Sequence, residues 1–258
     1  MPTALITGAS AGLGEGFARE LARRGHDLIL TARRAERLHE IAAELRAGNG
    51  VAVHVFASDL AEPGAPDRLL AEVTAAGLSV DTLINNAGYG LRGDFAEQDR
   101  AAVLGMIDLN CRSLVALAHG VLPQMLERRG GGILNLASTA AFQPGPWMAV
   151  YYATKAFVLS FSEALHEEVR EQGVRVTALC PGPTRTEFAG RAGMTDMPLF
   201  TALASDAEGV VRDGLAALEA GRAVKVSGVV NALMADATRF TPRLLARKVA
   251  GALQKRRG

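Results

Sequence analysis

The chain has 258 residues, of which 49% are hydrophobic and 21% are charged. Its 28 Lys and Arg nearly balance its 27 Asp and Glu, so no general field is present that would hold nucleic acid. These figures exclude a disordered or fibrous chain and suit one globular domain, which we expect to span residues 1–258. Cys111 and Cys180 lie in no disulfide or metal-ligand spacing, so we expect no metal site and a reducing, cytoplasmic setting.

Membrane-spanning and secretory segments are not expected. Charges, glycines or prolines interrupt every apolar run before it reaches the roughly 20 residues that span a bilayer. The first residues, MPTALITGAS, lack the basic and apolar regions of a signal peptide. We therefore expect a soluble protein, or at most a peripheral one.

Short runs rich in β-branched residues and leucine alternate with longer stretches of helical period. Strands are predicted at Thr3–Thr7, Leu28–Thr31, Val51–Ala57, Thr82–Asn85, Ile133–Ala137, Arg175–Leu179 and Ala223–Val226. Helices are predicted at Gly14–Arg24, Ala35–Arg46, Pro66–Ala76, Gln98–Glu127 and Tyr151–Gln172, and another begins at Ser205, where Ser205 and Glu208 have the form of a capping box. This alternation predicts an α/β fold with a doubly wound parallel sheet of seven strands and helices on both faces.

A glycine-rich turn, from Thr7 to Gly14, connects the first strand to the first helix. Such glycines permit a tight turn and close backbone approach to a phosphate, and the helix N-terminus offers unpaired N–H groups to an anion. This position predicts a Rossmann-type dinucleotide site rather than a turn alone. The residues expected at the cofactor are Gly8, Ser10, Gly12, Leu13 and Gly14.

The end of the second strand selects between the two dinucleotides. An acidic residue there would bind the 2′-hydroxyl of NAD, whereas an arginine would accept the 2′-phosphate of NADP. The sequence has Arg33 and Arg34 at this point and no carboxylate, which favours NADP over NAD. The alternative is that both arginines are solvated residues at a helix start.

The spacing TGxxxGxG is the form found in the short-chain dehydrogenase/reductase family, and three further stretches resemble motifs of that family in the same order. These are Asn85-Asn86-Ala87-Gly88, Tyr151-Tyr152-Ala153-Thr154-Lys155 and Pro181-Gly182. The resemblance implies the sheet order 3-2-1-4-5-6-7. It also implies cofactor contacts from Asp59, Leu60, Asn86, Ala87, Gly88, Pro181, Gly182, Thr184 and Thr186. Many NADP-dependent members carry a basic residue at position 11, where this chain has Ala11.

The same resemblance implies a catalytic set of Ser, Tyr, Lys and Asn. Lys155 follows Tyr151 by four residues, so on a helix both side chains share one face, and the ammonium is expected to lower the pKa of Tyr151. Tyr151 would be the general acid/base of hydride transfer between a nicotinamide and a carbonyl carbon, and Lys155 would also bind the cofactor's ribose. Ser138 would hold the substrate oxygen, and Asn110 would anchor a proton relay.

Spacing by itself leaves two alternatives open in this set. Tyr152 lies at i+3 from Lys155, which helical geometry also allows, and Thr139 could offer a hydroxyl in place of Ser138. The family pattern selects Tyr151 and Ser138.

Substrate choice depends on three segments that the motifs leave undefined: Tyr89–Phe95, Thr139–Val150 and Glu187–Ser205. Their larger side chains are mostly apolar: Tyr89, Leu91, Phe142, Trp147, Phe188, Met194, Met197, Leu199 and Phe200. We expect an apolar ketone, aldehyde or secondary alcohol, held beneath a lid at about residues 187–205.

The last residues carry segregated charge. From Asp236 to Gly258 there are seven bases and one acid, so this tail has a charge of +6 and the remainder −5. Thr241-Pro242 predicts a helix start, after which Leu245, Val249 and Leu253 form an apolar stripe beside the bases. We expect this helix to dock on the body with its basic face in solvent; contact with an anionic membrane surface is the alternative.

The sequence therefore predicts an NADP-dependent oxidoreductase acting on a small-molecule carbonyl or alcohol. By resemblance it would be a homodimer or homotetramer, without a nucleic-acid partner. The alternative function is a non-catalytic NADP-binding sensor or scaffold that acts through its basic tail.

Overall fold

The computed structural model describes residues 1–193 and 204–254 and contains one parallel sheet of seven strands. The strands are β1 (Thr3–Thr7), β2 (Asp27–Thr31), β3 (Val53–Val55), β4 (Thr82–Asn85), β5 (Gly132–Leu136), β6 (Arg175–Cys180) and β7 (Val224–Val226). Their order across the sheet, β3-β2-β1-β4-β5-β6-β7, is the order that the family resemblance implied. The seven predicted strands are confirmed, and β3 is the one most shortened at both ends.

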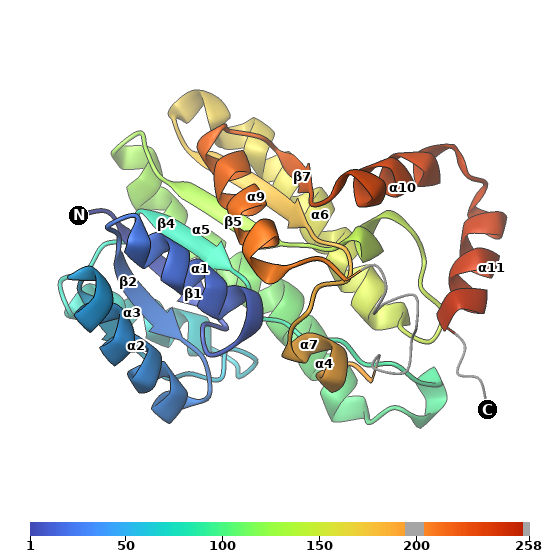
Figure 1. Cartoon of the computed structure of the whole chain (residues 1–258), viewed down its shortest axis with the longest axis horizontal. Coiled ribbons are helices and arrows are strands. Elements are labelled where there is room, and N and C mark those ends of the chain that lie inside the picture. The colour runs from blue at the N-terminus through green and yellow to red at the C-terminus, as the bar shows by residue number, and fades with distance from the viewer. Residues whose placement is uncertain (194–203, 255–258) are drawn as a thin grey trace.

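Helices connect the strands and cover both faces of the sheet (Figure 1). They are α1 (Gly12–Arg23), α2 (Ala35–Asn49), α3 (Ala65–Ala75), α4 (Arg100–Ile107), α5 (Leu114–Glu127), α6 (Ala149–Val169), α7 (Glu187–Arg191), α9 (Ala207–Glu219), α10 (Val229–Phe240) and α11 (Arg243–Gln254). Side chains alternate between faces along each strand, so Ile6 packs with α1, α2 and α9, whereas Leu5 packs with α3, α5 and α6. The result is a single three-layer domain with an apolar core on each side of the sheet.

The stretch predicted as one long helix, Gln98–Glu127, is divided by a π-helical turn at Asp108–Ser113. Taken together, Arg100–Glu127 is long and apolar enough to cross a membrane by length and composition alone. Leu117 and Val121 on its inner side belong to the core beneath the sheet. A helix that packs in the core of a globular domain can have the same length and composition. The core contacts of Leu117 and Val121 place this stretch in the helical layer on one face of the sheet.

Local sequence patterns mispredicted some helix boundaries. The N-cap of α9 is Asp206, whose carboxylate accepts a hydrogen bond from the Gly209 N–H at 3.2 Å, so the capping box starting at Ser205 was wrong. Neither α7 nor α10 was predicted. The loop before α11 does end at Pro242, whose carbonyl accepts the first backbone bonds of this helix.

The terminal helix docks on the body as expected, but through a different face. Its buried side consists of Ala246, Ala250 and Gln254, and Gly251 packs against the ring of Trp147. The predicted stripe faces outward, because Leu245 and Val249 are about half exposed. The Leu253 side chain and residues Lys255, Arg256 and Arg257 lie outside the described part of the chain.

Candidate active site

A cleft of about 960 Å³ lies at the carboxyl edge of the sheet, where ligands bind in open α/β folds. Of the predicted site residues, Gly14 and Asn110 are outside its lining. The others line it: Gly8, Ser10, Gly12, Leu13, Arg33, Arg34, Asp59, Leu60, Asn86, Ala87, Gly88, Ser138, Tyr151, Lys155, Pro181, Gly182, Thr184 and Thr186. The structure thus brings together turns that are far apart in the sequence.

The glycine turn has the backbone that its sequence predicts. Gly8 and Gly12 adopt left-handed φ angles of 66° and 57°, which side chains disfavour. A Cβ on Gly14 would lie 2.2 Å from the carbonyl oxygen of Gly8, so the absence of a side chain at Gly14 permits the helix to pack on the turn. Helix α1 begins at Gly12, and its cap Ala11 makes no side-chain capping bond within the described residues. The first N–H groups of α1 therefore suit a phosphate.

The turn after β4 is tied to the glycine turn by hydrogen bonds. The Asn86 amide donates to the carbonyl oxygen of Thr7 at 2.9 Å and of Gly8 at 3.3 Å. The Thr7 hydroxyl accepts from the backbone N–H groups of Asn86 at 3.0 Å and Ala87 at 2.9 Å. These bonds make the cradle for the cofactor a rigid unit of two adjacent turns.

The two arginines after β2 fit a 2′-phosphate. Arg34 donates to the Ser10 hydroxyl at 3.2 Å and to the Ser10 carbonyl at 2.9 Å, which places its guanidinium beside the glycine turn. Arg34 also pairs with Glu187 at 3.3 Å, and Arg33 pairs with Asp59 at 3.6 Å. Since 69% of the Arg33 side chain is exposed, that guanidinium can turn toward an incoming phosphate at little energetic cost.

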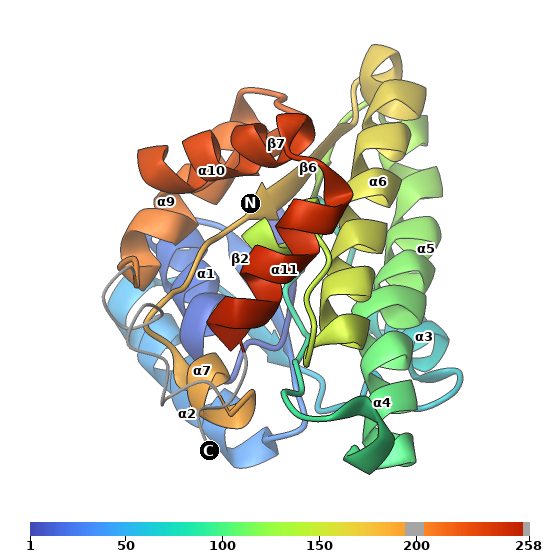
Figure 2. The same ribbon diagram turned by 90° about the vertical axis from the view of Figure 1, so that its right-hand side faces the viewer.

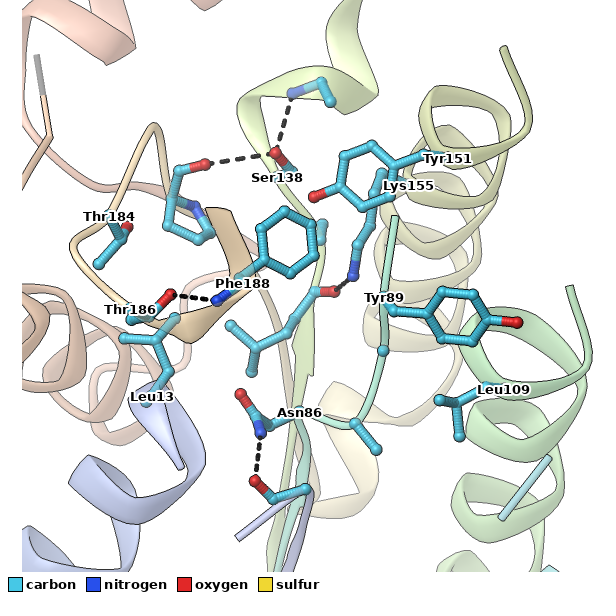
Figure 3. Close-up of a pocket in the computed structure, with 18 of the residues that line it drawn as sticks. Leu13, Asn86, Tyr89, Leu109, Ser138, Tyr151, Lys155, Thr184, Thr186 and Phe188 are labelled. Carbon is cyan, nitrogen blue, oxygen red and sulfur yellow. Dashed lines mark hydrogen bonds between the residues drawn. The ribbon is translucent and has the colours of Figure 1, made fainter. Parts of the chain in front are cut away.

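Ser138, Tyr151 and Lys155 meet at the other end of the cleft (Figure 3). Ser138 follows β5, where its hydroxyl accepts from the Ala140 N–H at 3.1 Å and donates to the Pro181 carbonyl at 3.4 Å. Tyr151 and Lys155 both extend from the first turns of α6, and the Lys155 ammonium lies 5.9 Å from the centre of the Tyr151 ring. That ammonium donates to the Leu136 carbonyl at 2.5 Å.

Burial determines the protonation of these groups. It raises the pKa of Tyr151 well above its usual value, and the hydrogen bond with Ser138 opposes this shift. We expected Lys155 to lower the pKa of Tyr151, but desolvation is the largest contribution and the direction of the shift is upward. Burial also lowers the pKa of Lys155 to about 8. At neutral pH the pair is a neutral phenol beside an ammonium ion.

Asn110 lies in the π-helical turn and is buried. Its amide oxygen accepts from the Tyr89 N–H at 3.1 Å, and its amide nitrogen donates to the Tyr89 carbonyl at 3.0 Å and to the Thr154 hydroxyl at 3.1 Å. A Cβ on Gly88 would lie 2.9 Å from the Asn110 oxygen. The side chain of Asn110 thus holds the Gly88–Tyr89 turn in place beside Lys155.

The alternatives to Tyr151 and Ser138 have other surroundings. The Tyr152 hydroxyl accepts a hydrogen bond from the Gln254 amide of α11, and burial raises the pKa of Tyr152 to about 12. The ring of Tyr152 packs against Gly145, where a Cβ would have no room. Thr139 also lines the cleft, but Ser138 is the hydroxyl that is hydrogen-bonded to Tyr151.

Thr184 and Thr186, expected at the nicotinamide, lie between β6 and α7. Thr184 is buried, and its hydroxyl donates to the Gly182 carbonyl at 3.0 Å. The Thr186 hydroxyl caps α7 by accepting from the Phe188 N–H at 3.3 Å. A cofactor contact by the Thr186 hydroxyl would share that oxygen with the cap.

The predicted substrate segments contribute in part. Tyr89 and Phe188 line the cleft, whereas Leu91 and Phe142 pack in neighbouring apolar clusters. Trp147 donates to the Asp94 carboxylate at 2.9 Å and packs on α11. Met194, Met197, Leu199 and Phe200, and with them most of the predicted lid, lie outside the described residues.

Sequence reasoning missed one wall of the cleft. It is built largely by the two terminal helices and includes Gln143, Asn231, Met234, Ala235, Thr238, Ala250 and Gln254. No local motif marks these positions, and only the exposed apolar period of 229–240 could have indicated that a helix follows β7. Within residues 1–193 and 204–254, no group of three His, Cys, Asp or Glu could hold a metal.

Comparison with known proteins agrees with this geometry. Residues 2–196 match the family model described as short chain dehydrogenase. Sulfoacetaldehyde reductase 2 of Chromohalobacter salexigens is 43% identical over 186 residues, which cover 71% of this chain and 73% of the relative. A short-chain dehydrogenase from Sphingobium yanoikuyae, solved in complex with NADPH, is 36% identical, has a TM-score of 0.84 and matches over 93% of both chains.

A third relative is the bulky-bulky ketone specific alcohol dehydrogenase from Comamonas testosteroni. It is 31% identical, has a TM-score of 0.79 and matches over 93% of this chain and 92% of its own. Fold, cofactor cradle and similarity to known proteins lead to one conclusion. The chain belongs to the short-chain dehydrogenase/reductase family and is an NADP-dependent oxidoreductase that interconverts alcohols and carbonyl compounds.

Proposed function

We propose that this enzyme uses NADPH to reduce ketones or aldehydes of largely apolar character, and that Tyr151 donates the proton to the carbonyl oxygen. The observation that carries this proposal is the convergence of Ser138, Tyr151 and Lys155 at one end of the cleft, where burial raises the pKa of Tyr151 above its usual value. A phenol that keeps its proton at neutral pH is a general acid, which carbonyl reduction requires. Alcohol oxidation requires the phenolate and is favoured at higher pH.

Ser138 and Lys155 support that proton transfer. The Ser138 hydroxyl orients the carbonyl oxygen beside Tyr151, and NADPH, when bound, supplies the hydride. Lys155 carries its positive charge below about pH 8 and stabilises the phenolate that Tyr151 becomes after it has given up its proton. Lys155 also binds the cofactor's ribose in this proposal.

Asn110 contributes to the reaction by positioning neighbouring groups. Two hydrogen bonds to the Tyr89 backbone hold the Gly88–Tyr89 turn, and a third to the Thr154 hydroxyl ties it to α6 beside Lys155. The proton relay from Lys155 to solvent that the family resemblance implies would run past this turn. Loss of the Asn110 amide would therefore affect the return of the proton to Tyr151.

The substrate class follows from the wall opposite the cofactor cradle. Met148, Phe188, Met234, Ala235 and Ala250 line it, and they offer apolar surface with few charges. The Comamonas relative acts on bulky ketones, which supports the same reading for this cleft. A cleft of about 960 Å³ also leaves space for such a ketone beside the cofactor.

We further propose a cytoplasmic homo-oligomer. Leu104, Ile107 and Phe157 on the outer sides of α4 and α6 are 44%, 42% and 45% exposed, and these are helices through which family members pair. Both cysteines are free, as a reducing compartment favours.

The test is reduction of a panel of ketones and aldehydes with NADPH, comparing the wild-type protein with Tyr151→Phe. We expect turnover of apolar ketones and a loss of kcat of at least about a thousandfold in the variant, with unchanged NADPH affinity. Tyr152→Phe is the matched control and should retain kcat within about tenfold. Retained activity in Tyr151→Phe, or turnover of charged substrates only, would overturn the proposal.

A further inference from the structure

The outer face of α10 is apolar and uncovered within the described part of the chain. Val229, Val230, Leu233 and Phe240 are 79%, 59%, 66% and 89% exposed. Their spacing places them along one side of the helix, while Ala235 on the opposite side is buried. Eight of the thirteen exposed large hydrophobic side chains described lie between Val229 and Val249, so this exposure is concentrated in one region.

Helix α11, which follows α10 in the chain, also exposes apolar side chains, and these alternate with bases. Leu244, Leu245 and Val249 are about half exposed, and Arg243, Arg247 and Lys248 are exposed beside them. Figures 1 and 2 show α10 and α11 together at the periphery of the domain, on the far side of β7 from the body of the sheet. We call the outward residues of these two helices the tail surface.

The charge of the tail surface distinguishes between two kinds of occupant. In the described part of the segment from Asp236 onward, three exposed bases, Arg243, Arg247 and Lys248, stand against one exposed acid, Asp236. A two-fold contact between copies would place two such segments against each other, which like charges oppose. Anionic lipid headgroups attract the same bases, and acyl chains accept the exposed Val, Leu and Phe side chains.

We propose that the tail surface binds the protein to the surface of an anionic lipid bilayer. The α10 side chains insert at the boundary between headgroups and acyl chains, and the bases of α11 contact the headgroups. The net charge of −5 on the remainder of the chain keeps the body away from the bilayer and so orients the domain.

The same two helices form a wall of the substrate cleft. Met234 lines the cleft and is 54% exposed at its edge, and Thr238, Ala250 and Gln254 line it further in. A bilayer held by the tail surface would thus lie next to this wall. Substrates that dissolve in lipid could then reach the cleft without crossing bulk water.

Sedimentation with phospholipid vesicles tests the proposal on the full chain. We expect binding to vesicles that contain phosphatidylglycerol, at least tenfold weaker binding to pure phosphatidylcholine vesicles, and weakening by added salt. Two double variants address the two contributions: Leu233→Gln with Phe240→Gln, and Arg247→Glu with Lys248→Glu. Each should lower the partition coefficient at least tenfold.

Matched controls change an exposed apolar residue and an exposed base elsewhere. Phe95, 65% exposed, is changed to Gln, and Arg23, with 69% of its side chain exposed, is changed to Glu. These controls should bind vesicles as the wild type does. All variants should retain NADPH affinity, which reports the fold.

Three outcomes would overturn the proposal. Absence of binding to phosphatidylglycerol vesicles would do so, as would binding that both tail variants retain. The third outcome is that the wild type does not bind vesicles and that light scattering finds a smaller assembly for Leu233→Gln with Phe240→Gln. That result would show that a second copy of the chain covers the surface. None of these results depends on carbonyl reduction.

Discussion

The two ends of the cleft are built in different ways. At the cofactor end, Gly8, Gly12 and Asn86 act through backbone conformation and bonds between neighbouring turns. At the substrate end, side chains converge from distant parts of the chain, as the contact between Tyr152 and Gln254 illustrates. The cofactor end therefore tolerates little change in shape, whereas the substrate end depends on how the last helices dock.

The largest effect is expected where backbone shape is essential. Gly14→Ala places a Cβ about 2.2 Å from the Gly8 oxygen, so the turn must move. We expect a loss of at least about 2 kcal/mol of stability and no measurable NADPH binding. Denaturant unfolding and fluorescence titration check this.

The matched control is Gly48→Ala in α2, where a Cβ would meet no described atom within 4 Å. It should be up to about 1 kcal/mol more stable, because alanine favours the helix. If both variants had the same stability and the same NADPH affinity, the close packing at Gly14 would not be required for folding or for cofactor binding.

The next effect concerns charge at the cofactor end. Changing Arg33 and Arg34 together to Ala removes both guanidinium partners of the 2′-phosphate, and we expect NADPH to bind about a hundredfold more weakly. NADH affinity should change less than threefold. Arg37→Ala is the control, because Arg37 of α2 pairs with Glu15 of α1 and Glu40 of α2 and does not line the cleft. An equal loss for both nucleotides would contradict selection by the arginines.

At the substrate end the expected effects are smaller. Gln254→Leu or Tyr152→Phe leaves one buried polar partner unpaired, which costs about 1–2 kcal/mol of stability. The double variant replaces both partners and should recover most of that loss. NADPH affinity should stay unchanged, and kcat/KM for ketones should fall several-fold. Gln172→Leu on the surface is the control, and equal losses in the single and double variants would show that the pair is not coupled.

The smallest effect is a pH dependence of stability. Burial lowers the pKa of Lys155 to about 8 in the folded protein, whereas its ordinary value of 10.5 applies in the unfolded chain. The unfolded state therefore binds more protons in this window, and the Lys155 contribution makes stability rise as pH increases from 8 to 10. We expect thermal unfolding of Lys155→Met, which lacks this group, to gain less over this range than that of the wild type. Parallel curves would show that Lys155 is not desolvated.

Much of the cofactor end was predictable, because local rules govern it. A strand followed by Gly8 and Gly12 predicts left-handed glycines, which the structure has. The absence of an acid before Arg33 predicts NADP, which is the cofactor of the relatives. The substrate end was less predictable from the sequence. Trp147 packs on α11 and Phe142 packs in an apolar cluster beside the cleft, although both were expected at the substrate. Apolar character identifies a buried side chain but not the neighbour that buries it.

By itself the sequence determined the alternation of strands and helices, the turn that holds the cofactor and the spacing of Tyr151 and Lys155. These depend on residues close in the chain, whose geometry one helix or one turn dictates. Only the tertiary structure decided the π-helical placement of Asn110, the contact of Gln254 with Tyr152, and the outward face of α10. Each results from packing between elements that the chain separates, where desolvation and shape outweigh local preference.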